Sequence, residues 1–140
     1  MKVRATFGCA LGLLVMAIFV QGLTMQALLA GPAGQAVDSD KVYCGDAKTY
    51  QKPGTVRGAD VYKQIPEYQR IIDLNLTRED PEYWVLATRA SQKFHAAIAR
   101  AALGAGLDLV AEAGAIRGGD KTPPDVTGLA IRMLKENAES

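Results

Sequence analysis

A long stretch without glycine or proline constrains the fold of this chain more than any other feature of its sequence. After Pro81, neither residue type occurs up to Leu103, and alanine, the strongest helix former, is frequent there. The stretch predicts a helix of roughly 23 residues, which is ~35 Å long at 1.5 Å per residue. Gly104 and Gly106 are expected to end it, because glycine readily adopts the left-handed conformation of a helix C-terminus.

One face of the predicted helix carries a regular stripe of aromatic and alanine side chains. Their spacing alternates between four and three residues, the heptad-like pattern of helices that pack along their length. The nearest candidate partner is the amphipathic segment 61–74. The stripe either belongs to the core of one subunit or forms a seam shared with another subunit or partner. These seam residues are Tyr83, Ala87, Ala90, Phe94, Ala97 and Ala101.

The segments around this helix predict the rest of a mixed fold. Asp60 is a candidate cap for the helix over residues 61–74, which Pro66 interrupts because proline removes a backbone donor. Residues 107–113 largely alternate apolar and acidic side chains, which predicts a strand paired as a hairpin with residues 114–120. Asp125 or Thr127 is expected to cap a last helix. We therefore expect an α+β fold, mostly helical, in which a coiled-coil-like helical hairpin joins a small β-strand body and a C-terminal helix.

The N-terminus has the parts of a secretory signal. Lys2 and Arg4 precede an uncharged apolar run over residues 5–20, and small residues follow at the two positions that a signal peptidase reads. Cleavage is expected after Ala33 or Ala36, with Ala36 favoured. An uncleaved span of about 20 residues is the alternative, and membrane contact is expected in that case alone. The predicted organisation is a signal peptide or anchor (1–36), an irregular linker (37–54) and a folded domain (55–140) that is periplasmic or secreted, or anchored and facing outside the cytoplasm.

Charge and side-chain chemistry argue against several functional classes. The 16 basic residues include Lys2 and Arg4 of the leader, which leaves 14 against 15 acidic ones, and the two signs alternate, so no nucleic-acid partner is expected. His95 is the chain's one histidine and lies far from Cys44 in sequence, too few soft ligands for a zinc site. We expect no enzyme activity, catalytic residue, cofactor or metal. Cys44 is either a free thiol or part of an intermolecular disulfide.

Three short stretches resemble the Skp/OmpH family of periplasmic chaperones. Residues 59–69 (ADVYKQIPEYQ) are similar to the family's step from its first strand into a helix at a "PEY"-like motif. Residues 107–110 (LDLV) after the long helix, and residues 125–127 (DVT) before the last one, are similar to its closing strand and final helix. The resemblance covers roughly residues 55–137.

The resemblance implies a homotrimer whose small β-rich body carries helical arms that hold unfolded proteins. The expected function is an exported, ATP-independent holdase chaperone that binds unfolded envelope or outer-membrane proteins. Because the predicted arms are shorter than those of the family, a deep client cavity is not expected. The alternative is a structural or adaptor protein of the envelope, with or without a membrane anchor, that binds one defined partner through its helix seam.

Overall fold

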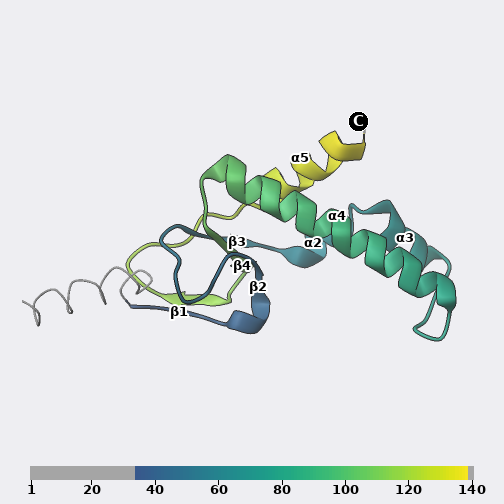
Figure 1. Cartoon of the computed structure of the whole chain (residues 1–140), viewed down its shortest axis with the longest axis horizontal. Coiled ribbons are helices and arrows are strands. Elements are labelled where there is room, and N and C mark those ends of the chain that lie inside the picture. Colours follow the sequence, from purple (N-terminus) through teal and green to yellow (C-terminus); the bar gives the residue numbers. More distant parts are fainter. Residues whose placement is uncertain (1–33, 139–140) are drawn as a thin grey trace, which may run out of the picture. The chain divides into compact units, whose positions relative to one another are not determined.

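Helix α4 (Pro81–Ala105) is the longest element of the computed structural model, which describes residues 34–138 (Figure 1). The helix begins at the predicted proline, and the preceding Asp80 is extended. It continues two residues beyond the predicted end and stops before Gly106, whose φ of 65° is left-handed. The prediction of a long helix ended by glycine is therefore confirmed.

Two shorter helices share the buried face of α4. Helix α3 (Pro66–Asp73) packs against its first half, where Arg70 contacts Glu82 at 2.8 Å, and helix α5 (Thr127–Ala138) packs against its second half (Figure 1). A five-residue helix α2 (Gly58–Tyr62) precedes α3, and the chain breaks between them before Pro66, as predicted. The described residues therefore give α4 two short partners in place of the one long helix that a coiled-coil-like hairpin requires.

A three-stranded sheet lies beside these helices, in the order β2 (Val42–Cys44), β4 (Leu109–Glu112) and β3 (Pro53–Val56). Strand β4 is central and pairs antiparallel with β2 and parallel with β3. Leu109, Val110 and Ala111 are all buried, because the central strand is covered on both faces. This explains why Val110 departs from the alternation expected of a half-buried strand.

The predicted hairpin of residues 107–113 with residues 114–120 is wrong. Strand β5 (Ile116–Gly118) pairs with β1 (Gln35–Val37) in a separate two-stranded ribbon. Both hydrogen-bonding edges of β4 are occupied by β2 and β3, so no edge of β4 remains for β5. The segment 37–54, predicted as irregular, holds the end of β1, a 3₁₀ turn (Ser39–Lys41), β2 and the start of β3. Strands of three or four residues are too short to leave a periodic pattern in the sequence.

The helix caps differ in part from the prediction. Asp60 is not an N-cap, because α2 begins at Gly58 and Asp60 lies in its first turn, 3.4 Å from Arg57. Asp125 does act at the start of α5, where its carboxylate accepts the backbone N–H of Thr127 at 2.8 Å.

Phe94 lies at the centre of the core, where its ring stacks on Tyr62 at 4.3 Å and meets the edge of Tyr43 at 4.9 Å. Around it α2, α4, the sheet and α5 contribute buried aliphatic side chains, among them Val61, Ile98 and Val110. The core thus joins helices and sheet into one body. Within residues 34–138 no helix combines the length and apolar character needed to cross a membrane. Residues 1–33 of the predicted leader lie outside the described residues.

Candidate functional site

The seam residues face inward within one chain. Ala90, Phe94, Ala97 and Ala101 have at most 1% of their surface exposed, and Tyr83 and Ala87 are half-buried. They pack under α3, α5 and the sheet. Of the two alternatives for this stripe, the structure has core packing, and four of its six side chains are inaccessible to a partner while the domain is folded.

Helix α3 and the first half of α4, with the connection between them, form an arm that we call the α3–α4 arm (Figure 1). Two ion pairs cross it: the Arg70 contact with Glu82, and Lys93 with Glu67 at 2.5 Å. Between the two helices Ile71 and Leu86 are buried. The two helices of the arm are therefore held together by these buried apolar side chains, with one ion pair near each end of the arm.

The connection at the free end of the arm is ordered by local hydrogen bonds. The Asp80 carboxylate accepts from the backbone N–H of Thr77 at 2.8 Å and from its hydroxyl at 3.1 Å. The Thr77 hydroxyl oxygen in turn accepts the N–H of Glu79 at 3.3 Å. The indole of Trp84 donates to the carbonyl of Arg78 at 2.9 Å. These bonds hold the Trp84 ring against the connection while leaving the ring half exposed.

Large apolar side chains are exposed at this end of the arm. Among the described residues five large hydrophobic side chains are exposed, and four of them lie between positions 72 and 85. We call these four the apolar tip: Ile72 (55% exposed), Leu74 (52%), Trp84 (54%) and Val85 (51%). The fifth, Leu103, lies near the opposite end of α4. Exposed large apolar side chains gathered at one end of a domain favour a contact surface there.

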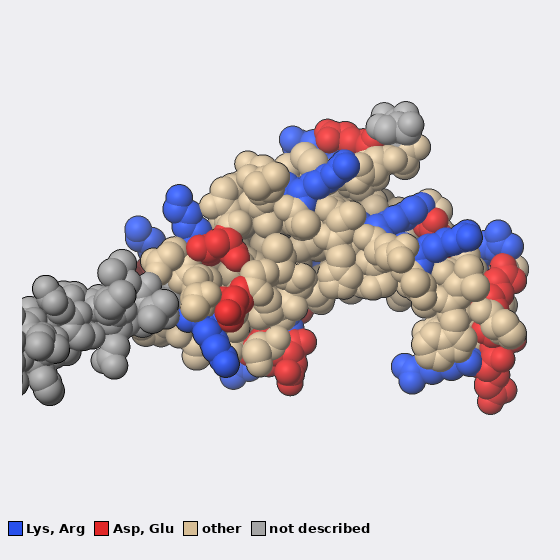
Figure 2. All heavy atoms as spheres, in the orientation of Figure 1, with Lys and Arg blue, Asp and Glu red and all other residues tan. Residues whose placement is uncertain are grey.

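The charges around the apolar tip are balanced. Residues 70–89 contain three arginines, four carboxylate side chains and no lysine. Figure 2 shows basic and acidic side chains interspersed at this end of the arm and over the rest of the visible face. Burial raises the pKa of the Glu67 carboxyl, but the bonds from Lys93 and from its own backbone N–H outweigh that effect and the pKa lies below its ordinary value. The ion pair between Glu67 and Lys93 is therefore present at neutral pH. The apolar tip offers a contact surface on which neither charge sign dominates.

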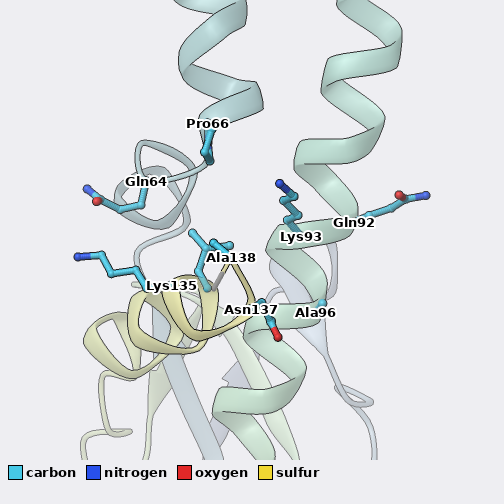
Figure 3. A pocket seen from close by; sticks show the side chains of 9 residues that line it. Gln64, Pro66, Gln92, Lys93, Ala96, Lys135, Asn137 and Ala138 are labelled. Carbon is cyan, nitrogen blue, oxygen red and sulfur yellow. The ribbon is translucent and has the colours of Figure 1, made fainter. Parts of the chain in front are cut away.

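A cleft of about 320 Å³ opens where the start of α3, the middle of α4 and the end of α5 meet (Figure 3). Pro66, Ala96, Leu134 and Ala138 give it an apolar lining. Figure 3 shows Gln64 and Lys135 extending outward on one side and Gln92 on the other, while Lys93 reaches toward α3. Because these polar groups lie at the rim, the cleft can take an apolar side chain, and its lining includes no hydroxyl, thiol or carboxylate.

A second polar cluster lies at the boundary of sheet and helices. One carboxylate oxygen of Glu112 accepts the Tyr43 hydroxyl at 2.7 Å and the backbone N–H of Gly58 at 3.0 Å. Burial, together with this hydrogen bond and the nearby negative charge, raises the pKa of Tyr43 to about 12. The phenol is therefore neutral over the physiological range and acts as a donor that ties β2 to β4. We infer that this cluster attaches α2 to the sheet, because Glu112 accepts the first backbone N–H of the helix.

The two residues considered for chemistry, His95 and Cys44, neither line the cleft nor belong to the apolar tip. His95 is exposed on α4, with its ring 6.4 Å from that of Tyr43, and Cys44 is half-buried on β2. Within residues 34–138 no group of three or more His, Cys, Asp or Glu side chains is placed to hold a metal ion.

The apolar tip was not predicted from the sequence. A signal was present, because Trp84 and Val85 fall off the 83-87-90-94 stripe of α4, where a surface helix is normally polar. Ile72 continues the four-and-three spacing of Val61, Ile65 and Tyr68, which predicts that it is buried, but the structure buries Ile71 and exposes Ile72. The cleft had no sequence signal, since three segments far apart in the chain build it.

No family model, curated protein or solved structure matches this chain.

Proposed function

We propose that this protein is an exported holdase of the Skp/OmpH type, which binds unfolded envelope or outer-membrane proteins without ATP. The observation that carries the proposal is the apolar tip, where four large side chains are about half exposed at one end of the arm. Burial of apolar surface stabilises a contact by roughly 25 cal/mol per Å² whatever the partner's sequence. Contacts of this kind suit a protein that meets many unfolded chains.

The form of the arm supports weak and reversible binding. Helix α3 has eight residues, so the arm encloses little space compared with the long arms that the family resemblance implies. The balanced charge around the tip gives no strong electrostatic steering toward clients of either sign. We therefore propose that clients are held on the tip surface, with the cleft at Ala96 and Leu134 available for single apolar side chains.

We further propose that the protein acts as a homotrimer. A domain of about a hundred residues buries only about two thirds of its unfolded surface, and association with other subunits would bury more. In the described part of the chain β2 pairs on one side alone, so its outer edge is open to another subunit. The half-buried Cys44 on this strand cannot pair with two equivalent thiols at once, so a structural disulfide would indicate a two-fold dimer.

Removing the apolar tip is expected to weaken client binding. We predict that the exported protein slows the aggregation of an unfolded β-barrel protein diluted from urea without nucleotide, and that light scattering gives three times the chain mass. Trp84→Ser combined with Val85→Ser should raise the concentration needed for half protection roughly thirtyfold, since each side chain loses ~1 kcal/mol of apolar contact and every 1.4 kcal/mol is about a factor of ten. Because both side chains are half exposed, the melting temperature should change little.

Leu103→Ser is the matched control, because Leu103 is 83% exposed on the same helix outside the tip. It should leave protection unchanged. Equal protection by the double variant and the natural protein would contradict a role for the tip. A monomer that leaves client aggregation unchanged but retains one partner in a pull-down would support the envelope adaptor instead.

A further inference from the structure

Strand β1 lies where the sequence offers its two cleavage positions, after Ala33 and after Ala36. The strand pairs with β5 in the register Gln35 with Gly118, Ala36 with Arg117 and Val37 with Ile116. The pairing continues beyond the strand, where the backbone N–H of Asp38 donates to the carbonyl of Ala115 at 3.0 Å. Residues 35–37 are therefore a part of the folded domain rather than of a leader.

The backbone around β5 is shaped to accept the residues just before Val37. A Cβ atom on Gly118 would lie 2.4 Å from the carbonyl oxygen of Gly34, and one on Gly119 would lie 2.5 Å from the Gln35 side chain. Both glycines have left-handed φ angles, 77° and 82°. Close approach of Gly34 and Gln35 is thus possible because residues 118 and 119 carry no side chain. Gln35 is half-buried in this contact.

The two cleavage positions give products that differ in this strand. A cut after Ala36 removes two of the three paired residues of β1 and leaves the charged amine on Val37, inside the ladder. The two-stranded ribbon would then be lost and β5 would be left unpaired. A cut after Ala33 keeps all three pairs and places the new amine on Gly34, before the strand begins.

We infer that a signal peptidase cleaves this protein after Ala33, so that the mature chain begins at Gly34. Water hydrolyses the peptide bond between the two residues, which leaves a carboxylate on Ala33 of the leader and an amine on Gly34. Gly31 and Ala33 supply the small side chains that the peptidase reads. The inference rests on the proposed export and reverses the preference for Ala36 that the sequence alone suggested.

Two matched substitutions of alanine by lysine distinguish the sites. The full chain with a C-terminal tag is produced in a Gram-negative host, and the intact mass and N-terminal residue of the tagged product are measured in each cell fraction. Ala33→Lys places a long charged side chain next to the scissile bond and should abolish the product that begins at Gly34. Ala36→Lys is the control: Ala36 is exposed on β1, so the domain tolerates lysine there and processing should be unchanged.

The natural protein and Ala36→Lys should both yield a periplasmic chain that begins at Gly34. A chain that begins at Val37, or a block of processing by Ala36→Lys and not by Ala33→Lys, would overturn the inference and leave the proposed export standing. A membrane-bound product that begins at Met1 and is reached by external protease would also overturn it, in favour of an anchor. Retention of the full chain in the cytoplasm would refute the proposed export itself.

Discussion

Phe94→Asp is expected to abolish cooperative folding of the domain. The Phe94 ring is fully buried between Tyr62 and Tyr43, and its loss removes both ring contacts. Truncation of a buried phenylalanine costs about 3–5 kcal/mol, and a carboxylate buried without a partner costs several more. This sum is comparable to the whole stability of a small domain, which is about 5–15 kcal/mol. Thermal unfolding followed by circular dichroism should therefore show no cooperative transition.

The control for this substitution is Ala99→Asp, which adds the same charge to an exposed position of the same helix. Its melting temperature should stay within a few degrees of the natural protein, as is usual for surface substitutions. Phe94→Leu should be intermediate, because it keeps the site apolar. A cooperative transition at an unchanged temperature in Phe94→Asp would contradict the central place given to this residue in the core.

Gly45→Ala is expected to be the most damaging single glycine substitution within residues 34–138. Gly45 follows β2 with a φ of 92°, and a Cβ atom there would lie 2.1 Å from the carbonyl oxygen of Asp108 and 2.9 Å from the Cα of Leu109. Both contacts are with backbone, so no side chain can rotate away, and β2 must move from β4. We expect the free energy of unfolding in urea to fall by about 4 kcal/mol, from strained backbone and overpacking together.

Gly114→Ala distinguishes the effect of backbone strain from the effect of overpacking. Gly114 has a similar φ of 85°, but a Cβ atom there would have no neighbour within 4 Å. The free energy of unfolding of Gly114→Ala should fall by about 1–2 kcal/mol, the cost of the left-handed conformation alone. If both variants lost the same stability, the close approach of residue 45 to the start of β4 would be disproved.

The long helix and its limits could be predicted because their causes are local. The absence of internal glycine and proline, the proline at the start and the glycine at the end each act within a few residues, so α4 follows from the printed sequence. The same holds for the break before Pro66 and for the role of Asp125 at the start of α5. The stripe on α4 was also recognised, since a helical period is repeated over six positions.

The pairing of strands could not be predicted in the same way. Residues 107–120 look like a hairpin in isolation, but β4 lies between β2 and β3, and β5 pairs with a strand about 80 residues earlier. Which edge a strand finds depends on which edges are already occupied. That information is spread over the whole chain, and strands of three or four residues carry little of it themselves.

The candidate surfaces also depend partly on local sequence and partly on the packing of the whole chain. A long helix with a periodic apolar face follows from the residue order, because a helix is stabilised by contacts among near neighbours. The packing of the whole chain fills this face with α3 and α5, so that Phe94 and Ala97 are core while Trp84 and Val85 are surface. Burial depends on what else packs nearby, and neither the helical period nor the composition of a segment specifies that.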